Sequence, residues 1–232
     1  MILKDKVALV TGASKGIGKA IALTLARQGV SLAISARTKG ELERTAAEIR
    51  QSGVKCLAFT GDMSKEDDIK RFVQTCLKEY GSLHILVNNA GMGYFKPVYE
   101  LRTSEWDEMF NLNARGLFIT TRECLPYLRK AGESVIVNVV SLAGKNFFVN
   151  GGGYAASKHA VLGFSRCLML EERNNGIRVL AICPGSVDTE FSTDPKRKKV
   201  LQAQDVADSI LHMIQLPQWA MVSEIDIRPT NP

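Results

Sequence analysis

The sequence predicts an α/β fold in which helices cover both faces of a doubly wound parallel sheet of about seven strands. Apolar runs with strand character recur at seven places, which are residues 7–10, 31–35, 55–59, 85–87, 135–140, 178–182 and 222–227. Amphipathic stretches with helical spacing lie between them, for example at residues 17–28, 42–51, 65–78 and 104–129. Such alternation implies right-handed crossovers onto one parallel sheet. No linker, repeat or low-complexity tract interrupts the 232 residues, so a single domain over residues 1–232 is expected.

Composition and charge exclude several classes of protein. Hydrophobic residues make up 45% and charged residues 23% of the chain, as in a globular protein. The net charge is +6, but Lys and Arg alternate with Asp and Glu, so we expect no nucleic-acid partner. The sequence has no apolar signal region and no stretch of membrane-spanning length, so we expect no membrane contact and a cytoplasmic location. The five cysteines show no metal-ligand spacing, and no metal is expected.

One short basic run breaks this pattern. Residues Lys196, Arg197, Lys198 and Lys199 follow Pro195 in a region that reads as a loop. The run is either a solvated surface or a docking point for a phosphorylated or acidic substrate carrier, because like charges on a loop attract anions.

The stretch over residues 157–171 carries more apolar side chains than one helix face can hold. One face is able to cover the sheet, and the surplus predicts burial against a second subunit. We therefore expect a homodimer or a homotetramer.

The first strand leads into a glycine-rich turn that is suited to a phosphate group. The turn reads Thr11-Gly12-Ala13-Ser14-Lys15-Gly16-Ile17-Gly18 and passes straight into a helical pattern. Gly12 permits a tight turn, Gly16 lets a pyrophosphate approach the backbone, and Gly18 lets helix and strand pack closely. Free N–H groups at the helix start then face the anion. The sequence thus predicts a Rossmann-type dinucleotide site, although a turn with this G-x-x-x-G-x-G spacing can also be purely structural.

The end of the second strand indicates which dinucleotide binds. An NAD site usually carries Asp or Glu there for the ribose 2′-hydroxyl, but this chain reads Ser35-Ala36-Arg37. Arg37 is able to meet a 2′-phosphate with a bidentate, charge-assisted contact, and Ser14 and Lys15 add a hydroxyl and a second positive charge. We expect NADP(H) rather than NAD(H).

Two further groups follow the third and fourth strands, where a crevice lies outside the carboxyl ends of a parallel sheet. Asp62 either hydrogen bonds the adenine or caps the next helix. Asn88-Asn89-Ala90-Gly91 follows the fourth strand, and its small residues let the backbone lie against the adenosine ribose. Asn89, Ala90 and Gly91 are therefore expected to contact the cofactor.

The chemical end of the site is expected around Ser141, Tyr154 and Lys158. Ser141 falls where the fifth strand ends, and the Tyr-x-x-x-Lys spacing puts Tyr154 and Lys158 on one helical face. A phenol with a pKa near 10 is a poor acid/base at neutral pH, and an adjacent ammonium stabilises its phenolate. The spacing alone also fits a surface pair, but its chemistry suits a Tyr154 acid/base that is tuned by Lys158.

Taken together, these segments closely resemble the short-chain dehydrogenase/reductase family over essentially the whole chain. The matching motifs are Thr11-Gly12-x-x-x-Gly16-x-Gly18, Asn88-Asn89-Ala90-Gly91, Asn113-x-x-Gly116, Ser141, Tyr154-x-x-x-Lys158 and Pro184-Gly185. Each motif is modest alone, but their joint order and spacing make a chance resemblance improbable. The resemblance implies an NADP(H)-dependent oxidoreductase that moves a hydride between nicotinamide and a substrate carbonyl.

The resemblance also implies roles for particular residues. Tyr154 would protonate the developing alkoxide, Ser141 would orient the carbonyl oxygen, and Lys158 would lower the Tyr154 pKa and hold the nicotinamide ribose. Asn113 would position a water in the proton relay, or it is only a turn or helix-kink residue. The segment from Pro184 to Thr189 would contact the nicotinamide carboxamide through Pro184, Gly185, Val187 and Thr189, or Pro184-Gly185 is only a loop.

The substrate is less well defined by the sequence. The glycine turn and the Tyr/Lys region resemble 3-oxoacyl carrier-protein or 3-oxoacyl-CoA reductases, whereas the C-terminal part resembles broad-range carbonyl reductases and 3-hydroxy-acid dehydrogenases. We therefore expect a small-molecule or thioester carbonyl. Tyr94, Phe95, Phe147 and Phe148 either line an apolar part of the pocket or belong to a core or an interface. The alternative function is an NADP(H)-binding regulatory or scaffold protein without significant turnover.

Overall fold

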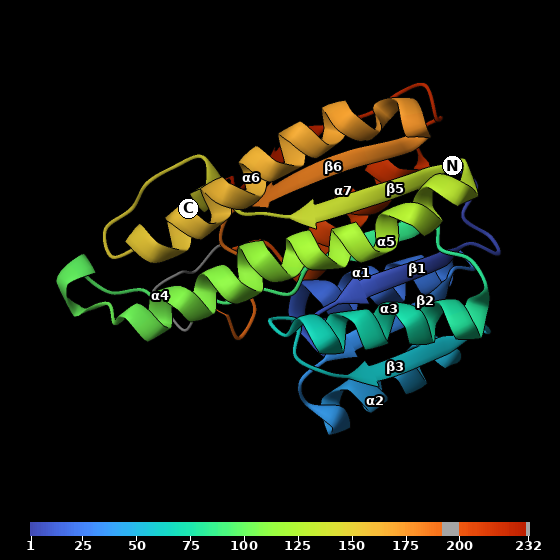
Figure 1. The fold of residues 1–232 in the computed structure, drawn as a ribbon, viewed down its shortest axis with the longest axis horizontal. Helices are drawn as coiled ribbons and strands as arrows, with labels where there is room; N and C mark the ends of the chain where they lie inside the picture. Colours follow the sequence, from blue (N-terminus) through green and yellow to red (C-terminus); the bar gives the residue numbers. More distant parts are fainter. Residues whose placement is uncertain (192–199, 231–232) are drawn as a thin grey trace.

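The seven strands of the protein pair in parallel into one sheet, in the order β3-β2-β1-β4-β5-β6-β7. The structure is a computed structural model that describes residues 1–191 and 200–230 (Figure 1). The strands are β1 (Val7–Thr11), β2 (Ser31–Ala36), β3 (Cys56–Thr60), β4 (Ile85–Asn88), β5 (Ser134–Val139), β6 (Ile177–Pro184) and β7 (Glu224–Ile227). All seven strands that the sequence predicts are present, so the predicted fold class is confirmed.

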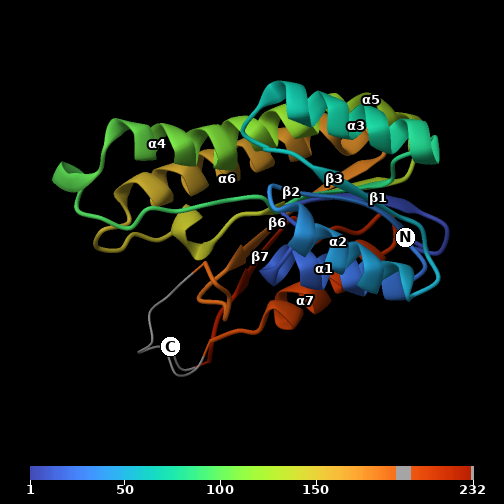
Figure 2. The same ribbon diagram turned by 90° about the horizontal axis from the view of Figure 1, so that it is seen from below.

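Helices cover both faces of the sheet, as Figure 2 shows from below. One layer holds α1 (Gly16–Arg27), α2 (Lys39–Arg50) and α7 (Ala203–Gln215). The other holds α3 (Glu66–Tyr80), α4 (Thr103–Phe110), α5 (Leu117–Ala131) and α6 (Gly152–Glu172). Alternation along β1 explains why both layers are needed, since Ala8 and Val10 belong to one buried cluster and Val7 and Leu9 to the other. Both faces of a parallel strand are thereby buried.

The order of the strands places the site. β1 lies between β2 and β4, so the direction in which the sheet is built reverses there. In an open α/β sheet the loops after two such strands run to opposite sides and leave a crevice at their carboxyl ends. The glycine turn after β1 and the Asn-Asn-Ala-Gly segment after β4 both start at this edge. In Figure 1, α4 and the start of α6 project beyond the same edge.

The stretch predicted as one helix over residues 104–129 is divided in the structure. α4 ends at Phe110, a π-helical turn (η2, Asn111–Gly116) follows, and α5 then continues to Ala131. Apolar periodicity does not reveal a widened turn of this kind, because the pattern resumes on the same face. π-helical turns often mark functional sites, and this one contains Asn113.

α6 begins at Gly152, five residues before the apolar stretch that predicts it. Tyr154 and Lys158 therefore both lie on this helix, which confirms the predicted spacing on one face. Three short helical turns, η1 (Val98–Glu100), η3 (Leu142–Gly144) and η4 (Arg173–Asn175), complete the described elements.

Across residues 1–191 and 200–230, no helix combines the length and the apolar character needed to cross a membrane. The basic run from Lys196 to Lys199 lies outside the described residues.

Candidate active site

The glycine turn after β1 adopts a backbone that only glycine tolerates well. Gly12 and Gly16 have φ angles of +67° and +57°, in the left-handed region. At Gly18 the limit is space, because a Cβ would lie 2.3 Å from the carbonyl oxygen of Gly12. α1 starts at Gly16, so its first N–H groups, including that of Ile17, have no partner within the helix. The turn therefore offers the predicted anion cradle at a helix N-terminus.

The segment after β4 holds this turn in place through hydrogen bonds. The Asn89 side chain donates to the carbonyl oxygens of Thr11 and Gly12 at 3.0 and 2.9 Å. The Thr11 hydroxyl in turn accepts from the backbone N–H groups of Asn89 and Ala90, both at 3.0 Å. A Cβ on Gly12 would lie 2.9 Å from the Ala90 Cα, so the two loops are in backbone contact. The amide of Asn89 thus holds the cradle, a role that sequence reasoning did not assign.

The segment after β6 faces the glycine turn. Pro184 ends β6, and the Gly185 N–H donates to the carbonyl oxygen of Ile227 at 2.8 Å, which fixes the start of the segment to β7. Val187 is buried and pairs with Leu201. A Cβ on Gly16 would lie 3.3 Å from the Thr189 Cγ2. The structure thus brings Thr189 up to the cradle, as expected if this segment borders a cofactor.

Arg37, Ser14 and Lys15 lie at the open end of this crevice. Arg37 is exposed just after β2 and forms no hydrogen bond or ion pair with any described residue. The Ser14 hydroxyl donates to Glu41 at 3.4 Å, and the Lys15 ammonium forms an ion pair with Glu190. Hence Arg37 is ready to meet an anion, whereas Ser14 and Lys15 would have to leave carboxylate partners.

Asp62 stabilises the turn that precedes α3. Its Oδ1 accepts from the backbone N–H of Ser64 at 3.0 Å and from the Ser64 hydroxyl at 2.8 Å. α3 begins four residues later with Lys65 as its N-cap, so the interpretation of Asp62 as the cap of that helix is wrong. The carboxylate instead closes the turn that precedes the helix, and the Oδ2 has no hydrogen-bond partner among the described residues.

Tyr154 and Lys158 are both buried, with 8% and 5% of their surface exposed. The Lys158 Nζ lies 5.8 Å from the centre of the Tyr154 ring and donates to the carbonyl oxygen of Val139 at 3.1 Å. Burial raises the pKa of the Tyr154 phenol to about 12, because the interior disfavours the phenolate. For the same reason burial lowers the pKa of the Lys158 ammonium to about 8. Two groups with ordinary pKa values near 10 are thereby shifted in opposite directions.

Ser141 lies next to the phenol. It lies two residues after the end of β5, and the Ser141 hydroxyl opposes the rise of the Tyr154 pKa that burial causes. The Ser141 Oγ also accepts from the Ala143 N–H at 3.1 Å, which fixes the start of η3. The structure therefore brings together the three predicted residues Ser141, Tyr154 and Lys158, although they come from two different elements.

Asn113 is buried in the π-helical turn and binds the loop after β4. Its Oδ1 accepts from the Met92 N–H at 2.8 Å, and its Nδ2 donates to the Met92 carbonyl oxygen at 2.8 Å. The same Nδ2 donates to the Ser157 hydroxyl at 2.9 Å, which donates to the Tyr154 carbonyl oxygen at 2.7 Å. Both amide hydrogens are used, so the side chain joins the β4 loop to the helix that carries Tyr154.

The predicted aromatic residues divide into two groups. The Phe95 ring packs on Tyr154 at 5.3 Å between ring centres, and Phe148 packs on Phe95 at 6.0 Å. Phe147 instead points outward, is 84% exposed and stacks on His159, so it does not line the site. Tyr94 packs against the small apolar cluster that includes Tyr154, and its hydroxyl donates to Glu108.

Sequence reasoning missed Phe191, whose ring lies 5.7 Å from that of Tyr154. Phe191 follows the 184–189 segment by two residues, and no local pattern indicates that it crosses to α6. Its backbone N–H donates to Thr189 Oγ1 at 3.4 Å, so it is continuous with the residues that face the glycine turn.

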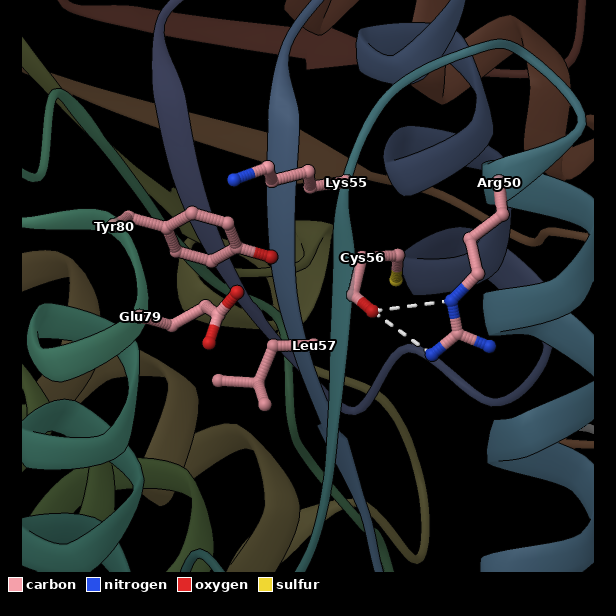
Figure 3. Close-up of a pocket in the computed structure, with 6 residues that line it drawn as sticks. All are labelled: Arg50, Lys55, Cys56, Leu57, Glu79 and Tyr80. Atoms are coloured by element: carbon pink, nitrogen blue, oxygen red, sulfur yellow. Dashed lines mark hydrogen bonds between the residues drawn. The ribbon is translucent and has the colours of Figure 1, made fainter.

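A separate hollow of about 440 Å³ lies beside the edge strand β3, between α2 and α3. Its lining residues are Arg50, Lys55, Cys56, Leu57, Glu79 and Tyr80 (Figure 3). Arg50 is already bonded to the carbonyl oxygen of Cys56, at 2.9 Å from Nη2, and none of the residues described above reaches it. Its place at the start of β3 puts it at the amino end of the sheet, so it does not share the crevice.

The crevice therefore joins an anion cradle, a free guanidinium and a buried phenol beside a buried ammonium. Such an arrangement suits a dinucleotide that reaches a proton donor. The glycine turn and Arg37 are suited to the phosphate groups of such a molecule, and Thr189 lies beside the glycine turn.

Comparison with known proteins gives consistent results. Residues 6–199 match the family model described as short chain dehydrogenase. An uncharacterised oxidoreductase of Staphylococcus aureus (strain MRSA252) is 31% identical over 230 residues, which cover 98% of this chain and 99% of the relative. Among solved structures, an alcohol dehydrogenase from the archaeon Thermococcus sibiricus complexed with 5-hydroxy-NADP has a TM-score of 0.92 and 34% identity, covering 98% of this chain and 97% of its own. A 3-ketoacyl-(acyl-carrier-protein) reductase from Brucella melitensis complexed with NADH has a TM-score of 0.91 and 32% identity, with 97% and 98% covered.

Proposed function

The chain belongs to the short-chain dehydrogenase/reductase family, and within this family of oxidoreductases we propose that it is an NADP(H)-dependent carbonyl reductase with Tyr154 as the proton donor. The observation that carries the proposal is the buried Tyr154–Lys158 pair, with the Ser141 hydroxyl acting on the pKa of the phenol. A buried ammonium and a buried phenol are costly to keep. A merely structural helix face would not need them.

The preference for NADP(H) over NAD(H) rests on Arg37. The guanidinium lies after β2, no carboxylate occupies the last positions of that strand, and no described residue pairs with it. A 2′-phosphate would satisfy it with charge-assisted hydrogen bonds. The solved relatives include one complex with an NADP derivative and one with NADH, so the preference is a property to be tested in this chain.

Residues of the chain carry out the other steps of the reaction. A bound reduced nicotinamide supplies the hydride that reduces the carbonyl carbon. Because the pKa of Tyr154 is raised to about 12, the phenol is protonated at neutral pH and donates its proton to the carbonyl oxygen. Ser141 donates a hydrogen bond to the same oxygen, where charge develops. The Lys158 ammonium below the ring then stabilises the phenolate until it regains a proton from water.

Asn113 acts through its neighbours. By fixing Met92 and Ser157, it sets the distance between the β4 loop and the turn of α6 that carries Tyr154. It is a positioning residue whose effect on the reaction is geometric.

The proposal is tested with a panel of carbonyl substrates and NADPH. The panel contains 3-oxoacyl thioesters, diketones, aldehydes and 3-hydroxy acids, the last with NADP⁺. We expect reduction of at least one ketone or aldehyde. If NADPH binds tightly and no member reacts in either direction, the protein is a cofactor-binding scaffold or regulator instead.

We also propose that the protein is a homo-oligomer, built on the outer faces of α5 and α6. Phe118, Tyr127 and Leu170 are 43%, 40% and 55% exposed on these helices, and Phe118 packs edge to face on Phe164. A second copy would cover these side chains. We expect sedimentation at micromolar concentration to give the mass of at least two chains. For Phe118→Glu we expect a lower mass. A monomer would contradict it.

A further inference from the structure

We propose that the rings of Phe95, Phe148 and Phe191 form an aryl-binding site beside the Tyr154 hydroxyl, and that the preferred substrates are neutral ketones with an aromatic group next to the carbonyl. The inference rests on the proposed reductase function and names its substrate class. It concerns side chains that differ from the predicted set, because Phe191 joins the site and Phe147 and Tyr94 do not.

The four rings form one continuous cluster. Phe95 contacts Tyr154 edge to face at 5.3 Å, Phe191 lies 5.7 Å from Tyr154, and Phe95 and Phe191 are 6.2 Å apart at 73°. Phe148 extends the cluster from Phe95 at 6.0 Å. All of these separations lie within the range of 4.5 to 7 Å at which aromatic rings attract each other. A further ring placed against the cluster would meet both edges and faces.

The cluster is only half covered. Tyr154 is 8% exposed, but Phe95, Phe148 and Phe191 are 44%, 47% and 44% exposed. Large apolar surface left open beside a reacting group is surface that a substrate is able to bury. Because the phenol lies at the inner end of the cluster, an aryl ketone bound there would place its carbonyl close to the proton donor.

The loops that carry Phe95 and Phe148 are tied to each other and to α4. The Lys96 N–H donates to the carbonyl oxygen of Asn150 at 2.9 Å, which ties one loop to the other. The Lys96 ammonium is paired with the buried Glu105 at 2.6 Å, which fixes the first loop to α4. Asn150 has a φ of +66°, a turn conformation that Asn tolerates better than most residues. Such fixed loops lower the entropic cost of binding.

Gly93 lies at the point where the rings converge. A Cβ there would lie 2.9 Å from the Phe95 Cζ, 3.0 Å from the Tyr154 Cδ2 and 3.3 Å from the Phe191 Cζ. Three rings from three separate segments thus pack on one backbone position.

The charges around the cluster favour a neutral substrate. Residues 91–105 and 141–151 contain three cations, Lys96, Arg102 and Lys145. Lys96 and Arg102 both pair with Glu105, and Lys145 pairs with Glu224 and Asp226. Within these described segments no unpaired cation is left to hold a substrate carboxylate or phosphate. An uncharged aryl ketone needs no such cation, so these two loops suit it.

The reaction balances without a further reagent. The hydride of NADPH forms the new C–H bond at the carbonyl carbon, the C=O π pair moves to oxygen, and the Tyr154 proton completes the O–H bond. The aryl ketone is reduced to a secondary benzylic alcohol, and NADPH is oxidised to NADP⁺.

The test compares two methyl ketones with the same number of carbon atoms, acetophenone and 2-octanone, with NADPH as reductant. We expect the wild-type kcat/KM for acetophenone to exceed that for 2-octanone by about tenfold or more. In Phe95→Ala and Phe191→Ala this ratio is expected to fall to within about twofold of unity. Phe95→Leu, which retains apolar volume, serves if the alanine variant does not fold. Phe147→Ala is the matched control, because this ring is exposed outside the cluster, and it keeps the wild-type ratio.

Two outcomes overturn the inference. A wild-type enzyme without preference for the aryl ketone contradicts it, and so does a preference that persists in both Phe95→Ala and Phe191→Ala. If no carbonyl is reduced at all, the proposed function fails, and binding of 1-phenylethanol to the NADP⁺ complex is measured instead. Binding that Phe95→Ala weakens at least tenfold would still support the aryl site. Binding that is absent or unchanged in the variant overturns it.

Discussion

The ammonium of Lys158 lies 5.8 Å from the centre of the Tyr154 ring, but its hydrogen bond at 3.1 Å goes to the backbone of Val139 and not to the phenol. The pKa of Tyr154 is raised by its own burial, so the expected lowering of this pKa by Lys158 stays a prediction. Burial likewise explains why the pKa of Lys158 falls to about 8.

This burial predicts that Lys158 costs stability. Its pKa is lower in the folded protein than the value of 10.5 for a free lysine, so the unfolded chain binds more protons between about pH 8 and pH 10.5. The wild-type free energy of unfolding should therefore gain from this group as the pH rises through that window. At pH 7 Lys158→Met should be more stable by about 2 kcal/mol, which allows for the lost bond to Val139.

The measurement is urea unfolding at pH 7 and pH 10. The exposed Lys78→Met is the control and should change little at either pH. A Lys158→Met variant that is less stable than wild type at pH 7 would show that burial of the ammonium does not destabilise the folded protein.

The contact between Gly18 and Gly12 predicts a large effect of one methyl group. In Gly18→Ala the Cβ would lie 2.3 Å from the Gly12 carbonyl oxygen and 2.4 Å from the Asn89 Nδ2, so the cradle must deform. We expect a loss of about 3 kcal/mol in unfolding free energy and much weaker NADPH binding. Thermal melting with and without NADPH measures both.

Gly40→Ala is the matched control for this variant. Gly40 lies in α2 with no atom within 4 Å of its Cβ position, so alanine there should stabilise the protein by about 0.5 to 1 kcal/mol. Equal melting temperatures for the two variants would contradict the packing argument.

The free guanidinium of Arg37 predicts that the protein binds NADPH more tightly than NADH. Arg37→Ser removes a free guanidinium after β2 that is suited to a 2′-phosphate, so the Kd for NADPH should rise by about 10- to 100-fold. The Kd for NADH should change little. Calorimetric titration with both cofactors measures the ratio of the two Kd values. Arg44→Ser, at an exposed position in α2, controls for the loss of one positive charge. A parallel loss of affinity for NADH would mean that Arg37 acts on the common part of the dinucleotide.

The hydrogen bonds of Asn113 predict that its replacement lowers turnover more than it weakens cofactor binding. Asn113→Ala leaves the Met92 N–H and carbonyl without their side-chain partner and removes the hydrogen bond that the Ser157 hydroxyl accepts. We expect kcat/KM for the carbonyl to fall by about 10-fold or more, with the Kd for NADPH within about threefold. Asn111→Ala, an exposed position in the same π-helical turn, should leave both unchanged. An Asn113→Ala enzyme with normal kcat/KM would remove it from the reaction.

Much of this site follows from order along the chain. The seven strands, the glycine turn and the Tyr-x-x-x-Lys spacing are local patterns, and the topology of a doubly wound sheet then brings Gly12, Asn89 and Thr189 to one edge. A periodic pattern does not reveal the widened turn at residues 111–116, because the apolar face continues across it.

Other features depend on contacts that no local pattern contains. Phe191 reaches Tyr154 only because the segment after β6 folds back toward α6. Likewise, the pairing of Lys15 with Glu190 joins residues 175 positions apart, and nothing near Lys15 indicates it. The sequence indicates which aromatic residues lie near the site. Tertiary packing decides which of them join the ring cluster and which face outward.

The proton transfer assigned to Tyr154 is tested most directly with Tyr154→Phe, in single-turnover reduction of a carbonyl by NADPH. Tyr127→Phe, a tyrosine at the far end of α5, is the control and should react at the wild-type rate. We predict that Tyr154→Phe binds NADPH with wild-type affinity and loses at least about 1,000-fold in the rate of hydride transfer. A Tyr154→Phe enzyme that binds NADPH normally and keeps a tenth or more of the wild-type rate would contradict the account.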